Sequence, residues 1–166
     1  MKKMFVLVLG LALVAGMVAA KDDKSSVAAK NTEKMKGFYR DVMNAHSVDA
    51  ISNYCTADFV DHNPDPGQKQ GLDGLKEAFK ALFTAFPDLH IEVITTVAEK
   101  DMVVAHITVS GTQKGAYMGM PASGKSFKMG AMDLIKIKDG KATDRWGYGD
   151  VMAMMQQLSP EKKADK

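Results

Sequence analysis

Cysteine is almost absent from this sequence of 166 residues, in which Cys55 stands alone. A single thiol cannot form a disulfide within the chain, even in an oxidising compartment. The residues around Cys55 match no local signature of a catalytic nucleophile, so we expect a small buried side chain there. Internal repeats and low-complexity blocks are also absent, which argues against a repeat architecture.

Neither sign of charge is in excess. The chain has 22 basic and 20 acidic residues, and the first 20 residues include two lysines and no acid. Without that segment the balance is 20 to 20, which is formally neutral. Neutrality argues against binding to nucleic acid or to an anionic membrane surface.

Residues 1–20 form an apolar segment that is short for a membrane span but has the features of a secretory signal peptide. Lys2 and Lys3 precede an almost wholly apolar stretch over 4–18, and small residues end the segment. We therefore predict cleavage after Ala20 and a protein exported to a periplasm or secreted, with no membrane attachment after cleavage. The alternative is an uncleaved membrane anchor.

The remaining chain is long enough for one domain with a hydrophobic core. We predict a flexible lead-in over residues 21–30, one domain over 31–159 and a charged tail over 160–166. Two stretches in the first half have apolar residues at helical spacing. These residues are Met35, Phe38, Tyr39, Val42 and Met43, and then Leu75, Phe79, Leu82, Phe83 and Phe86.

Between these helices we expect a short helix over 48–54 and an irregular or strand-like connection over 55–71. Alternating or β-branched runs then predict strands over 89–93, 102–110, 127–137 and 141–150, followed by a short helix to Leu158. Asp139-Gly140 is a tight-turn dipeptide that joins the last two strands into a hairpin. Helices followed by an antiparallel meander predict an α+β fold, with N-terminal helices on one face of a curved, mostly antiparallel sheet that encloses a pocket.

Asp133 lies among apolar residues in the strand predicted over 127–137. Alternation places it on the inner face with Phe127, Met129, Ala131, Ile135 and Ile137. A carboxylate there must be hydrogen-bonded or must face a cavity. The alternative is a structural acid that pairs with a lysine or arginine of a neighbouring strand.

Trp146, the chain's only tryptophan, lies in the last predicted strand. Regular alternation places it on one face with Ala142, Asp144, Tyr148 and Asp150. We expect this face to form one wall of the pocket, with Asp144 at its rim. Because the hairpin makes this strand adjacent to that of Asp133, the three aspartates can converge.

Asp61-His62-Asn63-Pro64 is a second polar cluster. A histidine in a proline-stiffened connection can act as a general acid or base, or as an orienting donor. The alternative is that Asp61 and His62 form only a turn. Their spacing fits no recognised metal-ligand pattern. The 13 methionines suggest adaptable packing around an apolar cavity rather than a soft-metal site.

Several segments, in this order, are similar to the SnoaL-like polyketide cyclase (ester cyclase) family. They are YCTADFVDHNP at 54–64, AFPDL at 85–89, GT at 111–112, GMPASGK at 119–125, and DGK at 139–141 with Trp146, Asp150 and Gln157-Leu158. The resemblance covers about residues 35–158. It implies the nuclear-transport-factor-two-like α+β cone around an apolar pocket, and ring closure of a polyketide ester without metal or cofactor.

The same resemblance implies roles for particular residues. Asp150, four places after Trp146, matches the acid/base aspartate of the family, and His62 matches a histidine that polarises an oxygen. As substrate-binding residues we expect Phe59, Asn63, Met120, Met129, Asp133, Trp146 and Tyr148. The resemblance also allows a homodimer.

Two functions from different classes follow. The first is binding of a small apolar or polyketide-like molecule with cofactor-free cyclase, isomerase or lyase chemistry by Asp150 and His62. The second is a non-catalytic periplasmic domain that uses the same cavity or sheet to hold a ligand or a protein partner.

Overall fold

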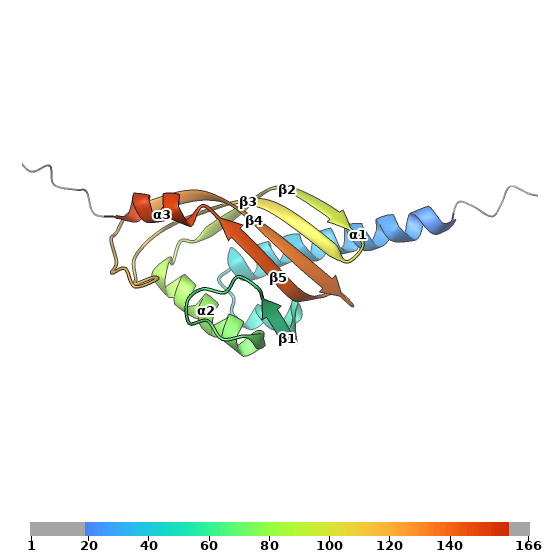
Figure 1. Ribbon diagram of the computed structural model, residues 1–166, viewed down its shortest axis with the longest axis horizontal. Coiled ribbons are helices and arrows are strands. Elements are labelled where there is room, and N and C mark those ends of the chain that lie inside the picture. Colours follow the sequence, from blue (N-terminus) through green and yellow to red (C-terminus); the bar gives the residue numbers. More distant parts are fainter. Residues whose placement is uncertain (1–18, 160–166) are drawn as a thin grey trace, which may run out of the picture.

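The computed structural model describes residues 19–159, in which helices cover one face of a five-stranded sheet (Figure 1). The strands are β1 (Cys55–Asp61), β2 (His90–Glu99), β3 (Met102–Thr112), β4 (Ser126–Lys138) and β5 (Lys141–Gly149). Their order in the sheet is β1-β5-β4-β3-β2, with β1 parallel to β5 and every other pair antiparallel. The predicted α+β fold with a mostly antiparallel sheet is therefore confirmed.

The helical elements are α1 (Ala19–Phe38), a π-helical turn (Tyr39–Met43), a short 3₁₀ helix (Asp49–Asn53), α2 (Gly71–Ala85) and α3 (Val151–Leu158). Residues 21–30, predicted as a flexible lead-in, are helical here. The predicted signal segment falls largely on residues 1–18, and the tail on 160–166, outside the described part of the chain. Within residues 19–159, no helix combines the length and apolar character that crossing a membrane requires.

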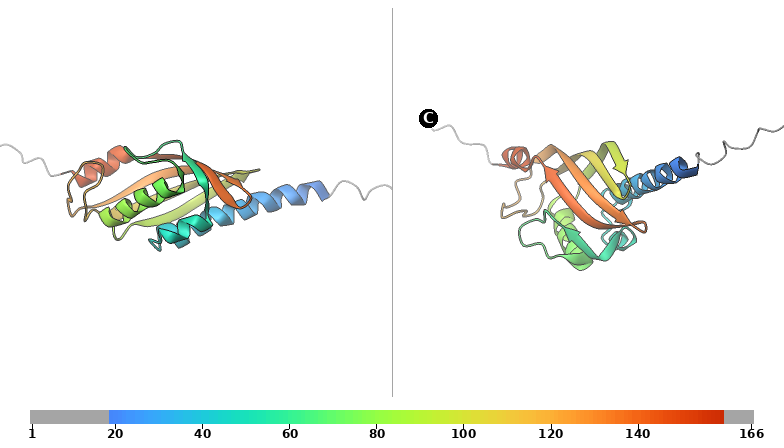
Figure 2. Two further views of the ribbon diagram at one scale, coloured as in Figure 1. Left: turned by 90° about the horizontal axis from the view of Figure 1, so that it is seen from below. Right: turned by 45° about the vertical axis from the view of Figure 1, so that its right-hand side comes forward.

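Helices α1 and α2 lie on the same side of the sheet (Figure 2). The apolar stripe of α2 explains this position, since Leu75 and the partly buried Phe79 and Leu82 pack into the core with the sheet. Helix α1 extends beyond the sheet at one end, and α3 lies at the other end (Figure 1). The sheet and these helices therefore enclose an interior between them.

A one-residue irregularity in β5 decides which of its side chains point inward. Lys136 is paired with Asp144, but the next residue of β4, Ile137, is paired with Ala142, so Thr143 is an extra residue in β5. Such a β-bulge shifts the alternation of side chains from that point on. Ala142 and Arg145 are therefore both on the inner face, and Asp144 is on the outer face.

The hairpin between β4 and β5 has the predicted tight turn. Asp139 and Gly140 both have positive φ angles, of 50° and 76°. Two consecutive left-handed residues are the geometry of a type I′ turn, for which Asp-Gly is a favoured sequence. This turn sets β4 and β5 side by side, which brings Arg145 opposite Ile135.

Candidate functional site

A cavity of about 280 Å³ lies between the inner face of the sheet and the helices. Most of its wall is apolar, and phenylalanine rings from helices and strands contribute much of it. These are Phe38, Phe59, Phe79, Phe86 and Phe127. The inner face predicted for the strand over 127–137 is confirmed, because Phe127, Met129, Ala131, Asp133, Ile135 and Ile137 all line the cavity. The cavity is therefore suited to an apolar molecule.

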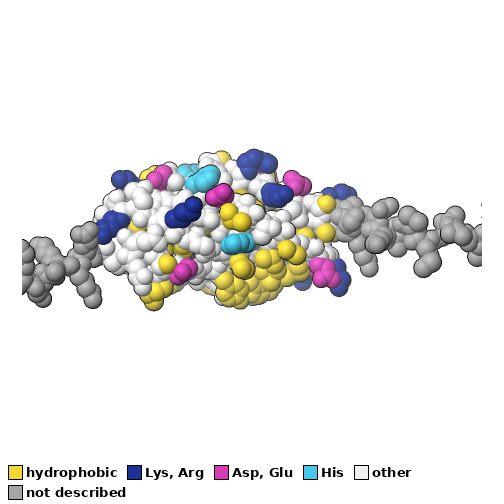
Figure 3. Space-filling view, turned by 90° about the horizontal axis from the view of Figure 1, so that it is seen from above, with side chains coloured by type: hydrophobic (Ala, Val, Ile, Leu, Met, Phe, Trp, Pro, Cys, Tyr) yellow, Lys and Arg dark blue, Asp and Glu magenta, His cyan; other side chains and the backbone are white. Residues whose placement is uncertain are grey.

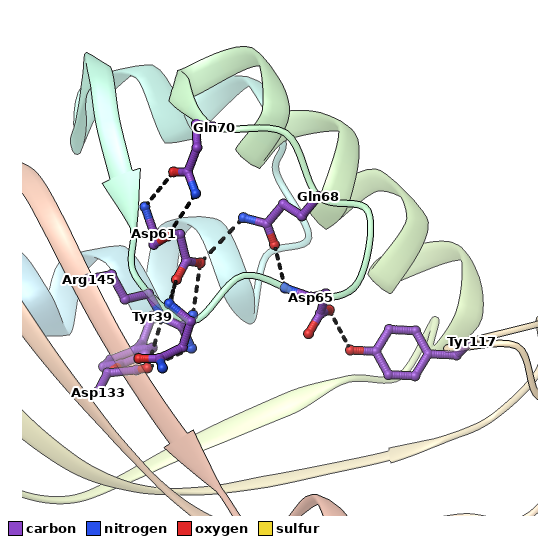
Figure 4. A network of polar contacts seen from close by, with 9 residues as sticks. Tyr39, Asp61, Asp65, Gln68, Gln70, Tyr117, Asp133 and Arg145 are labelled. Carbon is purple, nitrogen blue, oxygen red and sulfur yellow. Dashed lines mark hydrogen bonds and ion pairs between the residues drawn. The ribbon is translucent and has the colours of Figure 1, made fainter.

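One polar cluster interrupts this apolar wall, and Arg145 is its centre (Figure 4). The Arg145 Nε donates a hydrogen bond of 2.9 Å to Asp133 Oδ1, and Nη2 lies 2.8 Å from the same oxygen. The Tyr39 hydroxyl donates to Asp133 Oδ2 at 2.8 Å. Asp133 thus faces the cavity and also pairs with an arginine of the neighbouring strand. Each of the two alternatives given for it from the sequence therefore describes part of its environment.

Asp61 binds the other side of the Arg145 guanidinium. Arg145 Nη1 donates to Asp61 Oδ2 at 3.0 Å, and Gln68 Nε2 donates to the same oxygen at 3.3 Å. The backbone N–H of Asn63 donates to Asp61 Oδ1 at 3.0 Å. The Gln70 side chain binds the backbone N–H and carbonyl of Asp61 (Figure 4). Asp61 is 3% exposed and Asp133 8% exposed, so protein donors replace water around both carboxylates.

Burial and neighbouring charge together set the ionisation of this cluster. Burial lowers the pKa of Arg145, but the charges and hydrogen bonds of Asp133 and Asp61 outweigh it and raise that pKa overall. Burial, with the Asp133 charge, raises the pKa of Tyr39 well above its ordinary value. Arg145 therefore stays positively charged, and Tyr39 stays a protonated hydrogen-bond donor.

The cavity opens where two loops and the end of β5 meet. Exposed residues that line it there are Asn63, Asp65, Met118 and Tyr148. The Tyr117 hydroxyl donates to Asp65 Oδ2 at 2.9 Å, which connects the loop after β1 to the loop after β3 (Figure 4). Burial, followed by the charge of Asp65, raises the pKa of Tyr117, so this donor also stays protonated.

A second polar cluster lies on the outer face of β5. His62 stacks on Trp146 with ring centroids 4.2 Å apart and ring planes 1° from parallel. His62 Nε2 lies 2.9 Å from Asp144 Oδ1, and the Thr143 hydroxyl donates to Asp144 Oδ2 at 2.8 Å. The hydrogen bond from His62, followed by that from Thr143, lowers the pKa of Asp144. This cluster borders solvent, since the His62 side chain is 36% exposed.

The outer face of the sheet is also partly apolar. Met132 of β4 is 52% exposed and Val97 of β2 is 68% exposed. Tyr148, which borders the opening of the cavity at the end of β5, is paired with Met132 and is 63% exposed. Figure 3, viewed from this side of the molecule, shows hydrophobic side chains gathered into a patch.

The structure brings together five of the residues predicted to bind substrate. Phe59, Asn63, Met129, Asp133 and Tyr148 all line the cavity. Met120 packs partly buried against the core and is not among the lining residues. Nor is Trp146, which lies on the outer face because the bulge at Thr143 shifts the alternation. The expectation that Trp146 lines the pocket is therefore corrected, whereas Ala142 and Tyr148 of the face predicted with it do line the cavity.

The two residues expected to act as acid and base do not line the cavity. His62 belongs to the outer cluster. Asp150 follows Gly149 and precedes Val151, both of which line the cavity, but its Oδ1 accepts the Ala153 N–H at 3.0 Å and caps α3. Their catalytic roles stay predictions.

Convergence of the three aspartates is not observed. Asp133 is inside, opposite Gly147; Asp144 is outside, opposite Lys136; and Asp150 lies beyond the end of the strand. The bulge separates the first two, because without it Asp144 would share the inner face.

Arg145, the centre of the inner cluster, was not predicted as a site residue, and its partner Tyr39 was expected only as a core residue. One signal was present in the sequence. Arg40 and Arg145 are the chain's arginines and every other basic residue except histidine is lysine. Arginine is the usual choice where a buried cation must bind two carboxylates.

Metal and thiol chemistry find little support in the described residues. Between residues 19 and 159, no group of three or more His, Cys, Asp or Glu side chains is placed to hold a metal ion. Cys55 is buried, and burial raises the pKa of its thiol to about 12. A thiol with that pKa is a poor nucleophile near neutral pH, as predicted for a buried side chain.

Comparison with known proteins agrees with this geometry. Residues 33–158 match the SnoaL-like polyketide cyclase family. Aklanonic acid methyl ester cyclase DauD of Streptomyces sp. (strain C5) is 29% identical over 109 residues, which cover 65% of this chain and 66% of that protein. Aklanonic acid methyl ester cyclase DnrD of Streptomyces peucetius is 30% identical over 106 residues, which cover 63% and 71%. The match thus spans just under two thirds of the length of DauD.

Solved structures show the same fold. TsrD from Streptomyces laurentii has a TM-score of 0.69 and 26% identity, covering 81% of this chain and 96% of that protein. A SnoaL-like polyketide cyclase from Agrobacterium tumefaciens str. C58 has a TM-score of 0.66 and 20% identity, covering 78% and 98%. The family and the nuclear-transport-factor-two-like cone expected from the sequence motifs are confirmed. This chain belongs to the SnoaL-like polyketide cyclase family.

Proposed function

We propose that the protein binds an apolar, oxygen-bearing small molecule in the cavity and rearranges it as a cofactor-free cyclase or isomerase. One observation carries the proposal, namely an apolar cavity with one largely buried polar cluster among the described residues of its wall, made of Asp61, Arg145, Asp133 and Tyr39. Apolar walls take up the body of such a ligand, and the polar groups orient its oxygen. The names of DauD and DnrD, cyclases of a methyl ester, agree with this class of chemistry.

Proton transfer would fall to a carboxylate near the ligand. Asp150 is the candidate from the family motif, and it lies between two residues that line the cavity. Asp65 lines the opening, and its Oδ1 has no hydrogen-bond partner among the described residues. Asp61 and Asp133 are less suited, because donors from the protein already occupy oxygens of both carboxylates.

This saturation of Asp61 and Asp133 favours a second function, a binding domain of the same fold without catalysis. Arg145, Tyr39 and Gln68 donate hydrogen bonds to these carboxylates and leave few of their oxygen lone pairs free for a ligand. In this case the cavity holds its ligand unchanged.

Incubation of residues 21–166 with aklanonic acid methyl ester would distinguish the two functions. Chiral chromatography and mass spectrometry would then identify any product. Cyclase function predicts a ring-closed product, lost in Asp150→Asn or Asp65→Asn and retained in the outer-face variant Asp144→Asn. Binding of the ester without conversion favours the second function. Mass spectrometry of molecules that co-purify with the protein extends the test to other substrates.

Export is a further part of the proposal. Its support is the sequence of residues 1–20, with a basic start, an apolar centre and a small-residue end. Fractionation of cells that express the full chain, with N-terminal sequencing of the product, tests it. A product that starts at Lys21 in the exported fraction is expected, and full-length protein in the cytosol argues against export.

A further inference from the structure

Arg145 has donors that its two aspartate partners do not use. Within residues 19–159 its hydrogen bonds go only to Asp133, from Nε, and to Asp61, from Nη1, while Nη2 makes an ion-pair contact with Asp133. A guanidinium carries more N–H groups than these two hydrogen bonds occupy, so at least one remains free on each terminal nitrogen. The side chain is 33% exposed and lines the cavity. A molecule in the cavity can therefore reach these donors.

Gly147 provides the space in which this guanidinium lies. A Cβ atom on Gly147 would fall 2.1 Å from Arg145 Nη2 and 2.4 Å from its Cζ. Both distances are far below any allowed contact, so a side chain at residue 147 would displace the guanidinium. Residues 145 and 147 point to the same face of β5, so the position of the Arg145 head group depends on the missing side chain at 147.

The charge around Arg145 limits which oxygen can bind there. Two carboxylates, those of Asp61 and Asp133, contact one guanidinium, and Asp65 adds a third carboxylate at the opening. Lys34 also lines the cavity, but the ion pairs of Arg145 within residues 19–159 join it only to the two aspartates. A ligand carboxylate would be repelled by these charges, whereas an uncharged carbonyl oxygen gains hydrogen bonds without that cost.

We propose that Arg145, seated over Gly147, is the specificity-determining residue of the cavity, where it binds the uncharged carbonyl oxygen of a ketone or ester and disfavours the corresponding carboxylate. The proposal rests on the proposed function, because it requires that the cavity binds an apolar molecule. It adds the group that recognises the ligand and the chemical class of the recognised oxygen.

Three probes of similar shape test the proposal: 2-acetylnaphthalene, 2-ethylnaphthalene and 2-naphthoate, the last deprotonated at pH 7. Titration calorimetry of residues 21–166 is expected to give about tenfold tighter binding of the ketone than of the hydrocarbon, as one charge-assisted hydrogen bond supplies. The naphthoate is expected to bind most weakly of the three.

Two variants separate Arg145 from the rest of the cavity. Gly147→Ala is expected to abolish the preference for the ketone while the hydrocarbon binds as before. The matched control is Gly130→Ala in β4, where an added Cβ has no atom within 4 Å and the preference should be unchanged. Arg145→Lys, which keeps a positive charge between the aspartates, is a second variant and should also lose the preference, because an ammonium lacks the planar set of donors.

The outcomes distinguish the two proposals. If the ketone and the hydrocarbon bind with equal affinity, or if both variants keep the preference, the assignment of Arg145 is wrong while the cavity remains a binding site. Equal affinity for naphthoate and ketone overturns the selection for an uncharged oxygen. If no probe binds the unmodified protein, the proposed function fails and the assignment of Arg145 fails with it.

Discussion

The two faces of β5 each place a basic side chain against aspartate, but in opposite surroundings. On the inner face Arg145 lies between Asp61 and Asp133, which are almost fully buried. On the outer face His62 lies against Asp144 at the border with solvent. Removal of one partner of a buried ion pair strongly destabilises a protein, whereas an exposed ion pair contributes little to its stability. Similar ion pairs on the two faces of one strand therefore make very different contributions to stability.

The largest expected effect comes from breaking the inner cluster. Arg145→Met leaves two buried carboxylates without their cation, and we expect a loss of about 3–5 kcal/mol in the free energy of unfolding. Urea denaturation followed by circular dichroism measures it. Asp144→Ala on the outer face is the matched control, with a loss of no more than about 1 kcal/mol. Equal losses of unfolding free energy in the two variants would mean that the inner and outer clusters contribute equally to stability.

A second test of a buried polar group is offered by Gln113, which follows β3. Its side chain is fully buried, and neither its Nε2 nor its Oε1 has a hydrogen-bond partner among the described residues. Gln113→Met keeps the length of the side chain and removes the unpaired amide, so we expect thermal and urea unfolding to show a gain of about 1–3 kcal/mol. A loss of stability would mean that the amide is hydrogen-bonded in solution.

The outer cluster is tested by a double-mutant cycle of His62→Ala and Trp146→Ala. We expect a coupling of about 0.5–1.5 kcal/mol from the stacked rings. Affinity for 2-acetylnaphthalene should not change, because neither residue lines the cavity. A large fall in affinity would connect the outer cluster to the ligand and would support the role predicted for His62.

The smallest expected effect is the contribution of Asp144 to the pH dependence of stability. The folded state lowers the pKa of Asp144, so this carboxylate stabilises the fold above its unfolded pKa of about 3.9. That contribution is lost as the pH falls through the lowered pKa, that is, below about pH 4. Asp144→Asn should therefore lose slightly less stability than the unmodified protein between pH 5 and pH 3. An identical pH dependence in both proteins would contradict this.

The sequence predicted β4 better than β5, and the bulge explains why. Alternation runs unbroken through β4, so the inward position of Asp133 followed from its apolar neighbours. In β5 the extra residue Thr143 places each later side chain on the face opposite to the one that regular alternation predicts. Nothing in the local sequence marks it, because the bulge depends on pairing with β4 and β1.

The inner cluster could not be predicted as a whole for a related reason. Its members come from the π-helical turn after α1, the end of β1 and the middles of β4 and β5. Each residue has an ordinary local explanation, such as a core position for Tyr39 and a turn for Asp61. Their meeting depends on strand order, and in particular on the parallel pairing of β1 with β5, which periodicity does not reveal.

The hydrogen bond between Tyr117 and Asp65 has a consequence for kinetics. It joins two loops at the opening of the cavity, and Gly67 and Gly119 in these loops have left-handed backbones with no atoms crowding them. We infer that this hydrogen bond controls the residence time of a bound molecule, whereas the cavity wall controls its affinity. Stopped-flow exchange in Tyr117→Phe would then show faster entry and exit at unchanged affinity. Residence time and specificity would therefore be free to evolve separately.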